Sequence, residues 1–463
     1  MKKTGILLLF AVSVLVMVMF ISGCGSEKED SYDYMEGVYT VYIKGDNSDL
    51  FGSPDGIFYG ENYALRGRDS EKEVTVTIMD PDGRTIIRQT CGIRIYGGAS
   101  RESYLKSVKL YAREEYDEEN KQFSYDFFGT KKQDGSNETI DSYKRLVIRN
   151  CGNDFQFAWI RDELVQRLAA RAGYLYTEAV APVVMYINSE YRGLYWLHES
   201  YCDYYFKSKF GKDGRDGEFV VLEGSETRKN VEDDEGLERD AANEFNLAYE
   251  YLSSLDMTVE RNYSELCDFM DVENYLEYYA INVYVNNRDW PWNNYKCFRY
   301  YAQTDEEYAE SGVYDGRWRF LLHDTDFSLG LYDQRETQAS YDSLARLMDS
   351  SNTEGDFANY SPLFTKLMER DDCRQYFIDY TLELMNGAFS EENMLSMLQV
   401  MNDGRAEAME RFISYIESLR RQGASGMWAG SEHQEDQLDK IKKFIAQRAE
   451  YSLKYLRQDL GAE

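Results

Sequence analysis

The segment "NRDWPWNN" at residues 287–294 has polar side chains suited to phosphoryl transfer. Asp289 and Asn294 are five residues apart. A carboxylate can accept the proton of an attacking hydroxyl, and an amide oxygen can bind a divalent cation. The segment also holds two of the chain's six Trp and one of its five Pro. A packed aromatic helix end is therefore the alternative interpretation of these eight residues.

A second acidic cluster, "HDTDFSLG", occupies residues 323–330. Asp324 and Asp326 follow an apolar strand, and residues two apart on an extended chain point to the same side. Carboxylates are hard oxygen ligands that suit Mg²⁺ or Mn²⁺. This pattern predicts a metal-binding pair, although the pair alone also fits a solvated turn with Asp–backbone hydrogen bonds.

The elements expected to position these groups begin with a β-rich region. Alternating apolar residues and turn signals predict strands, one helix has a period near 3.6, and Gly173 follows that helix. The strands are expected at residues 38–43, 73–89 as a hairpin, 92–101, 106–112, 145–150 and 180–200 as a second hairpin, with the helix at 159–172. Together they predict a five- or six-stranded, mostly antiparallel sheet with one helix.

From about residue 230 the pattern is mainly helical. Two short strands are expected at 295–302 and 317–324, and helices follow one another after residue 360. The predicted fold class is therefore α+β, with a β-rich region at 36–230 and a helical region with the polar loops at 231–463.

The order of these features along the chain is informative. Lys106 and Lys109 lie on a strand, a helix follows, and the second hairpin ends at Glu199. The loop at 287–294 comes next, and then Asp326-Phe327-Ser328. Protein kinases place a Lys strand, a helix, a catalytic loop with Asp and Asn five residues apart, and an Asp-Phe-Gly signature in the same order.

The sequence resembles the spore-coat protein H (CotH) kinase family, in its secreted and lipoprotein branch. The resemblance covers roughly residues 36–332 and is weaker over the last 130 residues. The motifs that carry it are "IRIYGGASR", "KSVKLYAR", "LVIRNCGND", "IRDEL", "PVVMYINSEYRGLYWLHES", "NNRDWPWNN" and "HDTDFSLG". It implies an atypical, kinase-like bilobal fold and protein phosphorylation that depends on ATP and a divalent metal, Mg²⁺ or Mn²⁺.

The resemblance also implies roles for the acidic loops. Asp289 matches the family's catalytic Asp, and Asn294 matches the following Asn, a metal ligand. Asp326 matches the metal-binding Asp, and Asp324 is expected to be a supporting carboxylate.

For the phosphate-contacting Lys, the resemblance favours Lys106, with Lys109 as second choice. The two are three residues apart and point to opposite faces of a strand, so only one can face the nucleotide. Asp162 or Glu163 on the following helix is expected to pair with that Lys, and Glu199 is expected where kinases place the adenine-binding hinge.

The sequence departs from the protein-kinase pattern in the loop that would hold the nucleotide phosphates. No GxGxxG loop precedes the Lys strand, and "YGGASR" is the nearest equivalent, so Arg101 is the candidate for phosphate contacts. Trp290 and Trp292 are expected to form an aromatic wall near the substrate or the adenine, or to hold the loop rigid.

The first 24 residues have the form of a secretory signal. Two Lys precede an apolar run from Gly5 to Phe20, and Ile21-Ser22-Gly23-Cys24 resembles the lipobox of bacterial lipoproteins. Residues 1–24 are therefore expected to be a lipoprotein signal peptide with Cys24 as the lipidation site, and 25–35 a tether. The alternative is an uncleaved anchoring helix; either interpretation places the rest of the chain outside the cytoplasm, held to the cell membrane.

Composition limits the partners. The net charge of −31 repels nucleic-acid phosphates and favours basic partners or divalent cations. The sequence thus predicts a kinase for Ser/Thr of an extracytoplasmic or envelope protein, and the acidic charge favours a basic one. Two alternatives are a non-catalytic surface scaffold that retains the fold, and a carbohydrate hydrolase using Asp324 and Asp289.

Overall fold

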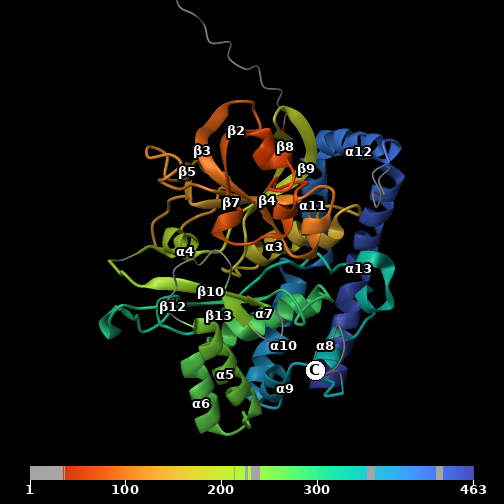
Figure 1. Ribbon diagram of the computed structural model, residues 1–463. Helices are drawn as coiled ribbons and strands as arrows, with labels where there is room; N and C mark the ends of the chain where they lie inside the picture. The colour runs from red at the N-terminus through yellow and green to blue at the C-terminus, as the bar shows by residue number, and fades with distance from the viewer. Residues whose placement is uncertain are drawn as a thin grey trace, which may run out of the picture. The chain divides into compact units, whose positions relative to one another are not determined.

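The strands of the N-terminal half close into a seven-stranded barrel in the order β1-β2-β3-β4-β7-β9-β8 (Figure 1). Their bounds are β1 Tyr39–Lys44, β2 Lys72–Met79, β3 Thr85–Tyr96, β4 Ser107–Tyr111, β7 Arg145–Arg149, β8 Val180–Ile187 and β9 Glu190–His198. In β2, alternate residues such as Val74 and Val76 are buried and fill the interior. This alternation is what the period of two in the sequence predicts.

This description is of a computed structural model, which covers residues 35, 37–212, 214–224, 228–230, 240–351, 360–423 and 431–462. Met35–Glu463 forms one compact unit. The expected signal peptide, Cys24 and all but the last residue of the tether lie outside the described residues. Among those described, no helix combines the length and apolar character needed to cross a membrane.

The expectation of a five- or six-stranded sheet was wrong in two respects. The expected hairpin at 73–89 and the expected strand at 92–101 are not separate, because β3 runs unbroken from Thr85 to Tyr96 and pairs with β2 and then β4. The first strand, β1, pairs with β8 in parallel, from Tyr39 opposite Val183. This single long-range pairing closes the sheet into a barrel.

A second sheet has the order β11-β10-β12-β13. Its strands are β10 Glu218–Gly224, β11 Arg228–Asn230, β12 Tyr295–Tyr301 and β13 Arg319–Leu321. β10 pairs along its full length with β12, so the expected division between residues 230 and 231 falls inside this sheet. The minor pair β5 Phe123–Ser124 and β6 Ser142–Tyr143 forms a separate two-stranded sheet.

Helices dominate the rest of the chain, which confirms the α+β class with a β-rich N-terminal half and a helical C-terminal half. Their bounds are α2 Asn47–Phe51, α3 Arg161–Arg171, α4 Asp203–Phe210, α5 Ala241–Ser254, α6 Glu260–Phe269, α7 Val272–Tyr284, α8 Ser343–Met348, α9 Pro362–Met368, α10 Asp371–Asn386, α11 Glu391–Asp403, α12 Ala406–Arg421 and α13 Ser431–Leu460.

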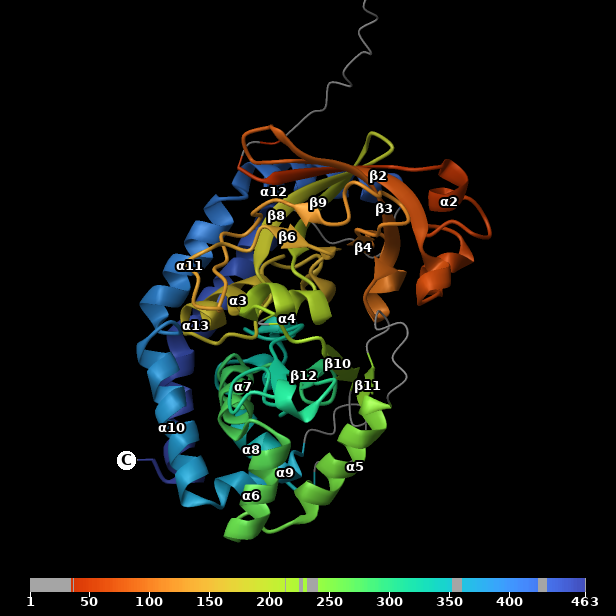
Figure 2. The same ribbon diagram turned by 90° about the vertical axis from the view of Figure 1, so that its left-hand side faces the viewer.

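The C-terminal helices reach both the barrel and the helices beyond the second sheet. α12 packs on β9, α11 on α3, and α13 on α8 and α10. Figures 1 and 2 show α13 running past α3 and the second sheet, with α5 and α6 at the end farthest from the barrel. The two sheets, α3 and α7 position the candidate site.

Candidate active site

A cavity of about 640 Å³ lies between the barrel and the second sheet. Five strands each contribute a lining residue: Tyr96 on β3, Lys109 on β4, Arg149 on β7, Glu223 on β10 and Lys296 on β12. Its volume is within the range of small-molecule sites. The cavity is therefore shaped by both sheets together.

The predicted catalytic loop follows helix α7 and reaches this cavity. Asn294 lines it, and its Nδ2 donates to Asp289 Oδ2 at 3.2 Å. Asn293 Nδ2 donates to the other oxygen, Asp289 Oδ1, at 3.1 Å. Burial, and next the nearby charge of Asp324, raise the pKa of Asp289 to about 6 against the opposing effect of these hydrogen bonds.

The aromatic part of the loop has a packing role. Trp290 is fully buried, and its ring contacts those of Tyr278 and Tyr279 edge-on, with centroids 5.5 and 4.5 Å away. Its ring therefore belongs to the core under the loop and does not form the expected wall. Trp292 is half-buried and is not among the residues lining the cavity.

Two backbone hydrogen bonds join this loop to the acidic segment that follows β13. The amide of Arg288 donates to the carbonyl of Phe327 at 2.9 Å, and the amide of Leu329 donates to that of Val285 at 3.1 Å. The loops carrying Asp289 and Asp326 are thus tied together directly, although 37 residues separate these two in sequence.

Asp324 and Asp326 lie at different depths in the site. Asp324 lines the cavity, whereas Asp326 is fully buried behind it. Asp326 Oδ2 accepts from the Asn153 amide at 2.8 Å, and Oδ1 from Asn153 Nδ2 at 3.2 Å. A Cβ on Gly152, whose φ is +52°, would lie 2.1 Å from Asp326 Oδ2. Only glycine therefore allows the chain to approach this carboxylate so closely.

The pKa values of these two neighbouring carboxyl groups are shifted in opposite directions. Burial raises the pKa of Asp326 well above its usual value, and the charge of Asp324 adds to this. Burial would also raise the pKa of Asp324, but the guanidinium of Arg149 and then His323 hold it below its usual value. Two carboxyls so close together favour one shared proton, or a cation, over two free charges.

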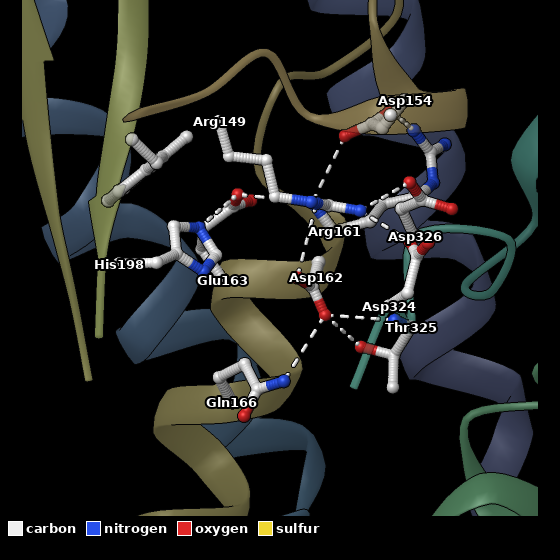
Figure 3. A network of polar contacts seen from close by, with 12 residues as sticks. Arg149, Asp154, Arg161, Asp162, Glu163, Gln166, His198, Asp324, Thr325 and Asp326 are labelled. Atoms are coloured by element: carbon white, nitrogen blue, oxygen red, sulfur yellow. Dashed lines mark hydrogen bonds and ion pairs between the residues drawn. The ribbon is translucent and has the colours of Figure 1, made fainter. Parts of the chain in front are cut away.

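Arg149, the last residue of β7, supplies a cation to this group. Its Nη2 lies 2.9 Å from Asp326 Oδ2 and also contacts Asp324 Oδ1. Its Nη1 lies 3.1 Å from Asp162 Oδ2 and 3.8 Å from Glu163 Oε1. Figure 3 shows the guanidinium between the acidic loop and the first turn of α3.

Helix α3 is connected to the acidic loop by the second oxygen of Asp162. Asp162 Oδ1 accepts from the amide of Thr325 at 2.9 Å and from its hydroxyl at 2.8 Å (Figure 3). Carboxylates in the first turn are also favoured by the helix dipole. The expected pairing of Asp162 with a strand cation is present, but the partner is Arg149 and not Lys106 or Lys109.

The two candidate Lys residues point to different environments. Lys109 lines the cavity, with its Nζ 5.5 Å from the ring centroid of Tyr96. Lys106 Nζ instead donates to the carbonyls of Arg101 and Ser103 and lies 4.4 Å from the ring centroid of Tyr63. The order of preference between them is therefore reversed: the geometry favours Lys109 as the residue that reaches a ligand.

Arg101 and Glu199, the two remaining residues expected to contact a ligand, both form hydrogen bonds with the backbone. Arg101 lines the cavity, but its guanidinium donates to the carbonyls of Gly97 at 2.6 Å and of Tyr63 and Leu65 at 3.1 Å each. Glu199 is buried, accepts from the amide of Ala179 at 2.9 Å, and does not line the cavity. Its neighbours Ser200 and Tyr201 line the cavity instead.

A buried chain of acid and imidazole groups runs beside Arg149. His198 Nε2 lies 3.2 Å from Glu163 Oε1 and its Nδ1 lies 3.0 Å from Glu178 Oε2, whose other oxygen lies 3.2 Å from His323 Nδ1. Burial would lower the pKa of His198, but its two carboxylate partners raise it to about 9. His198 is therefore a cation at neutral pH.

In the part of the chain that the structure describes, two groups of side chains could hold a metal. Asp162, Glu163 and His198 have ligand atoms within 4.8 Å of one another, but all three residues are buried and none of them lines the cavity. Asp324, Asp326 and Asn294 offer carboxylate and amide oxygens, and two of them line the cavity. The second group fits a hard divalent cation better, because all of its ligand atoms are oxygens and Asp324 and Asn294 line the cavity.

Most of the charged residues that line the cavity were not predicted from the sequence, although one of them lies in a recognisable motif. Arg149 lies in "LVIRNCGND", at the end of the strand directly before the α3 helix. The other charged or ionisable lining residues that were not singled out are Arg66, Arg94, Glu178, Glu223, Lys296 and His323. His323 precedes Asp324 in "HDTDFSLG", whereas the others come from distant segments, where no local pattern distinguishes them from solvated charges.

Comparison with known proteins identifies the family. No curated protein matches the chain. The family model described as CotH kinase protein matches residues 93–452, which is more than half of the 463 residues. The described residues before this match supply β1 and β2 of the barrel and Arg66, Gly67 and Ser70 of the cavity lining. The chain belongs to the CotH kinase protein family.

Proposed function

We propose that the protein is an atypical protein kinase that transfers the γ-phosphoryl group of ATP to Ser or Thr of another protein, with a divalent cation. One observation carries the proposal: Lys109, Asn294 and Asp324 line a single cavity of about 640 Å³. Asp289 is hydrogen-bonded to Asn294 at its edge. Phosphoryl transfer depends on such positioning and on charge neutralisation.

The charges in the cavity support a polyanionic ligand. Among the described residues that line it, six are Lys or Arg and three are Asp or Glu, although the chain as a whole has a net charge of −31. The six basic residues are Arg66, Arg94, Arg101, Lys109, Arg149 and Lys296. Basic side chains that line a cavity attract the phosphates of a nucleotide, even in a protein that is acidic as a whole.

Arg149 and Asp162 are suited to the role of the Lys–Glu ion pair of protein kinases. That pair joins a strand of the N-terminal lobe to the next helix and contacts the nucleotide phosphates. Here β7 leads to α3, and the 3.1 Å ion pair joins their facing ends. The comparison supports a kinase-like bilobal arrangement, with the barrel as the N-terminal lobe.

The metal would be held by Asp324, Asp326 and Asn294, and when bound it would neutralise phosphate charge. Asp289 accepts the proton of the substrate hydroxyl. The hydroxyl oxygen forms a bond to the γ-phosphorus, the bond from that phosphorus to the β–γ bridging oxygen breaks, and ADP leaves. Lys109 and Arg149 orient the phosphates during this step.

The protein substrate and the location are also part of the proposal. The net charge of −31 suits a Lys/Arg-rich substrate. The residues up to Cys24 suit a lipid anchor that places the kinase outside the cytoplasm. The substrate would then be a basic envelope or extracytoplasmic protein.

The test is ATP binding and autophosphorylation by the full-length chain with Mg²⁺ or Mn²⁺. Wild type should bind ATP in a metal-dependent manner and incorporate phosphate. Asp289→Asn should retain ATP binding but lose transfer, whereas Asp326→Asn should lose both. The exposed Asp403→Asn is the matched control and should behave as wild type. Absence of ATP binding by wild type would exclude the kinase and leave the scaffold.

A further inference from the structure

A buried guanidinium lies against the loop that carries Asp289. Arg346, on helix α8, is 5% exposed. Its Nη1 donates to the carbonyl of Arg288 at 3.2 Å, and its Nη2 donates to those of Asn287 at 3.1 Å and Trp290 at 3.3 Å. The three carbonyls belong to residues on both sides of Asp289.

Among the described residues, no carboxylate lies within 4.0 Å of the Arg346 guanidinium to form an ion pair. Burial, and next the charge of Arg288, lower the pKa of Arg346 to about 9. Burying an unpaired cation is costly. The carbonyl dipoles are the compensation that this structure provides, so the guanidinium and the loop conformation stabilise each other.

The loop needs such support because regular structure does not hold it. It lies between the end of α7 at Tyr284 and the start of β12 at Tyr295, and both Asn286 and Asn294 have positive φ, 53° and 60°. Asn adopts this left-handed conformation more readily than most residues, but the conformation is still uncommon and depends on its surroundings. Carbonyls that are left out of a helix or sheet also require donors.

Helix α8, which carries Arg346, is itself held in place by the C-terminal helix α13. Arg448 on α13 is 1% exposed, and its Nη2 donates to Ser343 Oγ at 2.7 Å and to the Val283 carbonyl at 2.6 Å. Ser343 begins helix α8, and Val283 lies in the last turn of α7. The helix carrying Arg346 and the helix preceding the loop are therefore fixed to each other.

We propose that Arg346 is a positioning residue, which fixes the conformation of residues 287–290 and thereby places Asp289 for proton acceptance. The proposal rests on the proposed kinase function. The guanidinium donates to these three carbonyls from two nitrogens of a rigid planar fork, a geometry that the compact ammonium of Lys does not reproduce, so we expect Lys not to replace Arg here. Arg346 does not line the cavity and does not act on the nucleotide itself.

The test compares wild type with Arg346→Lys and Arg346→Ala in the full-length chain. Three quantities are measured: kcat for phosphoryl transfer, the Kd of Mg-ATP, and amide hydrogen exchange of residues 285–294. We expect kcat to fall about 100-fold, the scale expected for a misplaced catalytic group. The Kd should stay within about threefold, and exchange should accelerate in the loop but not in β12. Added guanidinium should restore part of the kcat of Arg346→Ala.

The matched control is Arg370→Ala. Arg370 also holds a backbone carbonyl, that of Met257, and pairs with Glu260 and Asp372, and it does not line the cavity. Its loss should lower the melting temperature without changing kcat or exchange in the loop. A loss of kcat in Arg346→Lys that is matched by Arg370→Ala would mean general destabilisation, and the proposal would be wrong.

The remaining outcomes separate this proposal from the kinase function. Unchanged exchange of residues 285–294 in both Arg346 variants overturns the proposal, and so does faster exchange with unchanged kcat. If wild type binds no ATP, the kinase function fails, and with it Asp289's part in catalysis. The exchange measurement then still decides whether Arg346 fixes the loop.

Discussion

The ion pair between Arg149 and Asp162 joins the end of strand β7 to the first turn of helix α3, with 3.1 Å between Nη1 and Oδ2. Both side chains are almost completely buried. The same guanidinium also contacts Asp324 and Asp326 of the acidic loop. One cation therefore serves carboxylates from two parts of the chain, and these parts are held together at the candidate site.

Arg149→Met should destabilise the fold strongly, because it leaves buried carboxylates without their cation. Removing one partner of a buried ion pair costs about 3–5 kcal/mol. Urea unfolding should show this loss, and added Mn²⁺ should restore part of it by supplying positive charge to Asp324 and Asp326. The exposed Arg335→Met is the control and should change the free energy of unfolding by less than about 0.5 kcal/mol. Equal stability of the two variants would contradict the assigned role of Arg149.

Gly152→Ala should displace Asp326 from its position. The added Cβ would lie 2.1 Å from Asp326 Oδ2, at a residue whose φ is +52°. Gly129→Ala separates the two effects, because Gly129 has a φ of +66° but no atom within 4 Å of the added Cβ. Backbone strain should cost both variants roughly 1–3 kcal/mol. Only Gly152→Ala should also weaken Mn²⁺ binding, as measured by titration calorimetry; an equal effect in Gly129→Ala would exclude the steric explanation.

Lys109→Met and Lys106→Met should differ in nucleotide binding. Lys109 lines the cavity, so its loss should raise the Kd of Mg-ATP about tenfold, as expected for one charge-assisted contact. Lys106 donates to the carbonyls of Arg101 and Ser103, so its loss should leave the Kd unchanged and lower the melting temperature. Fluorescence titration and thermal unfolding measure the two effects. The opposite result would favour Lys106 as the Lys that contacts the phosphates.

The sequence predicted local elements well because their causes are local. The alternating apolar residues of β2 and the helical period of α3 are visible within 10 to 15 residues. The closure of the barrel is not, since Tyr39 pairs with Val183, 144 residues later, and no local pattern specifies that partner. The loops with Asp289 and Asp326 could be recognised from their motifs.

The residues that line the cavity were harder to predict, for a physical reason. Strand alternation separates Lys106 from Lys109, but it does not say which face of the strand meets the second sheet. The buried Arg residues of the C-terminal half presented a different difficulty. Arg346 and Arg448 bond to carbonyls from segments distant in sequence, and in the sequence they resemble ordinary charges on a helix surface.

Glu277 gives a prediction on stability that is independent of the site. It lies on α7, and Tyr376 Oη donates to its Oε1 at 2.8 Å. Burial, and after it the charges of Asp271 and Glu273, raise the pKa of Glu277 to about 7, despite the lowering effect of Tyr376. In the folded protein this carboxyl therefore keeps its proton at pH values where the unfolded chain, with a pKa near 4.5, has lost it.

Stability should consequently fall as pH rises from about 4.5 to 7, because in this range the folded state binds more protons than the unfolded state. Glu277→Gln cannot ionise and still accepts from Tyr376. Relative to wild type it should gain about 1–2 kcal/mol between pH 5 and pH 8, a value reduced from the full shift because the side chain is only partly buried. Urea unfolding at both pH values measures this gain, and the exposed Glu392→Gln should not show it. If Glu277→Gln and wild type lose stability equally over this range, Glu277 is already ionised in the folded protein.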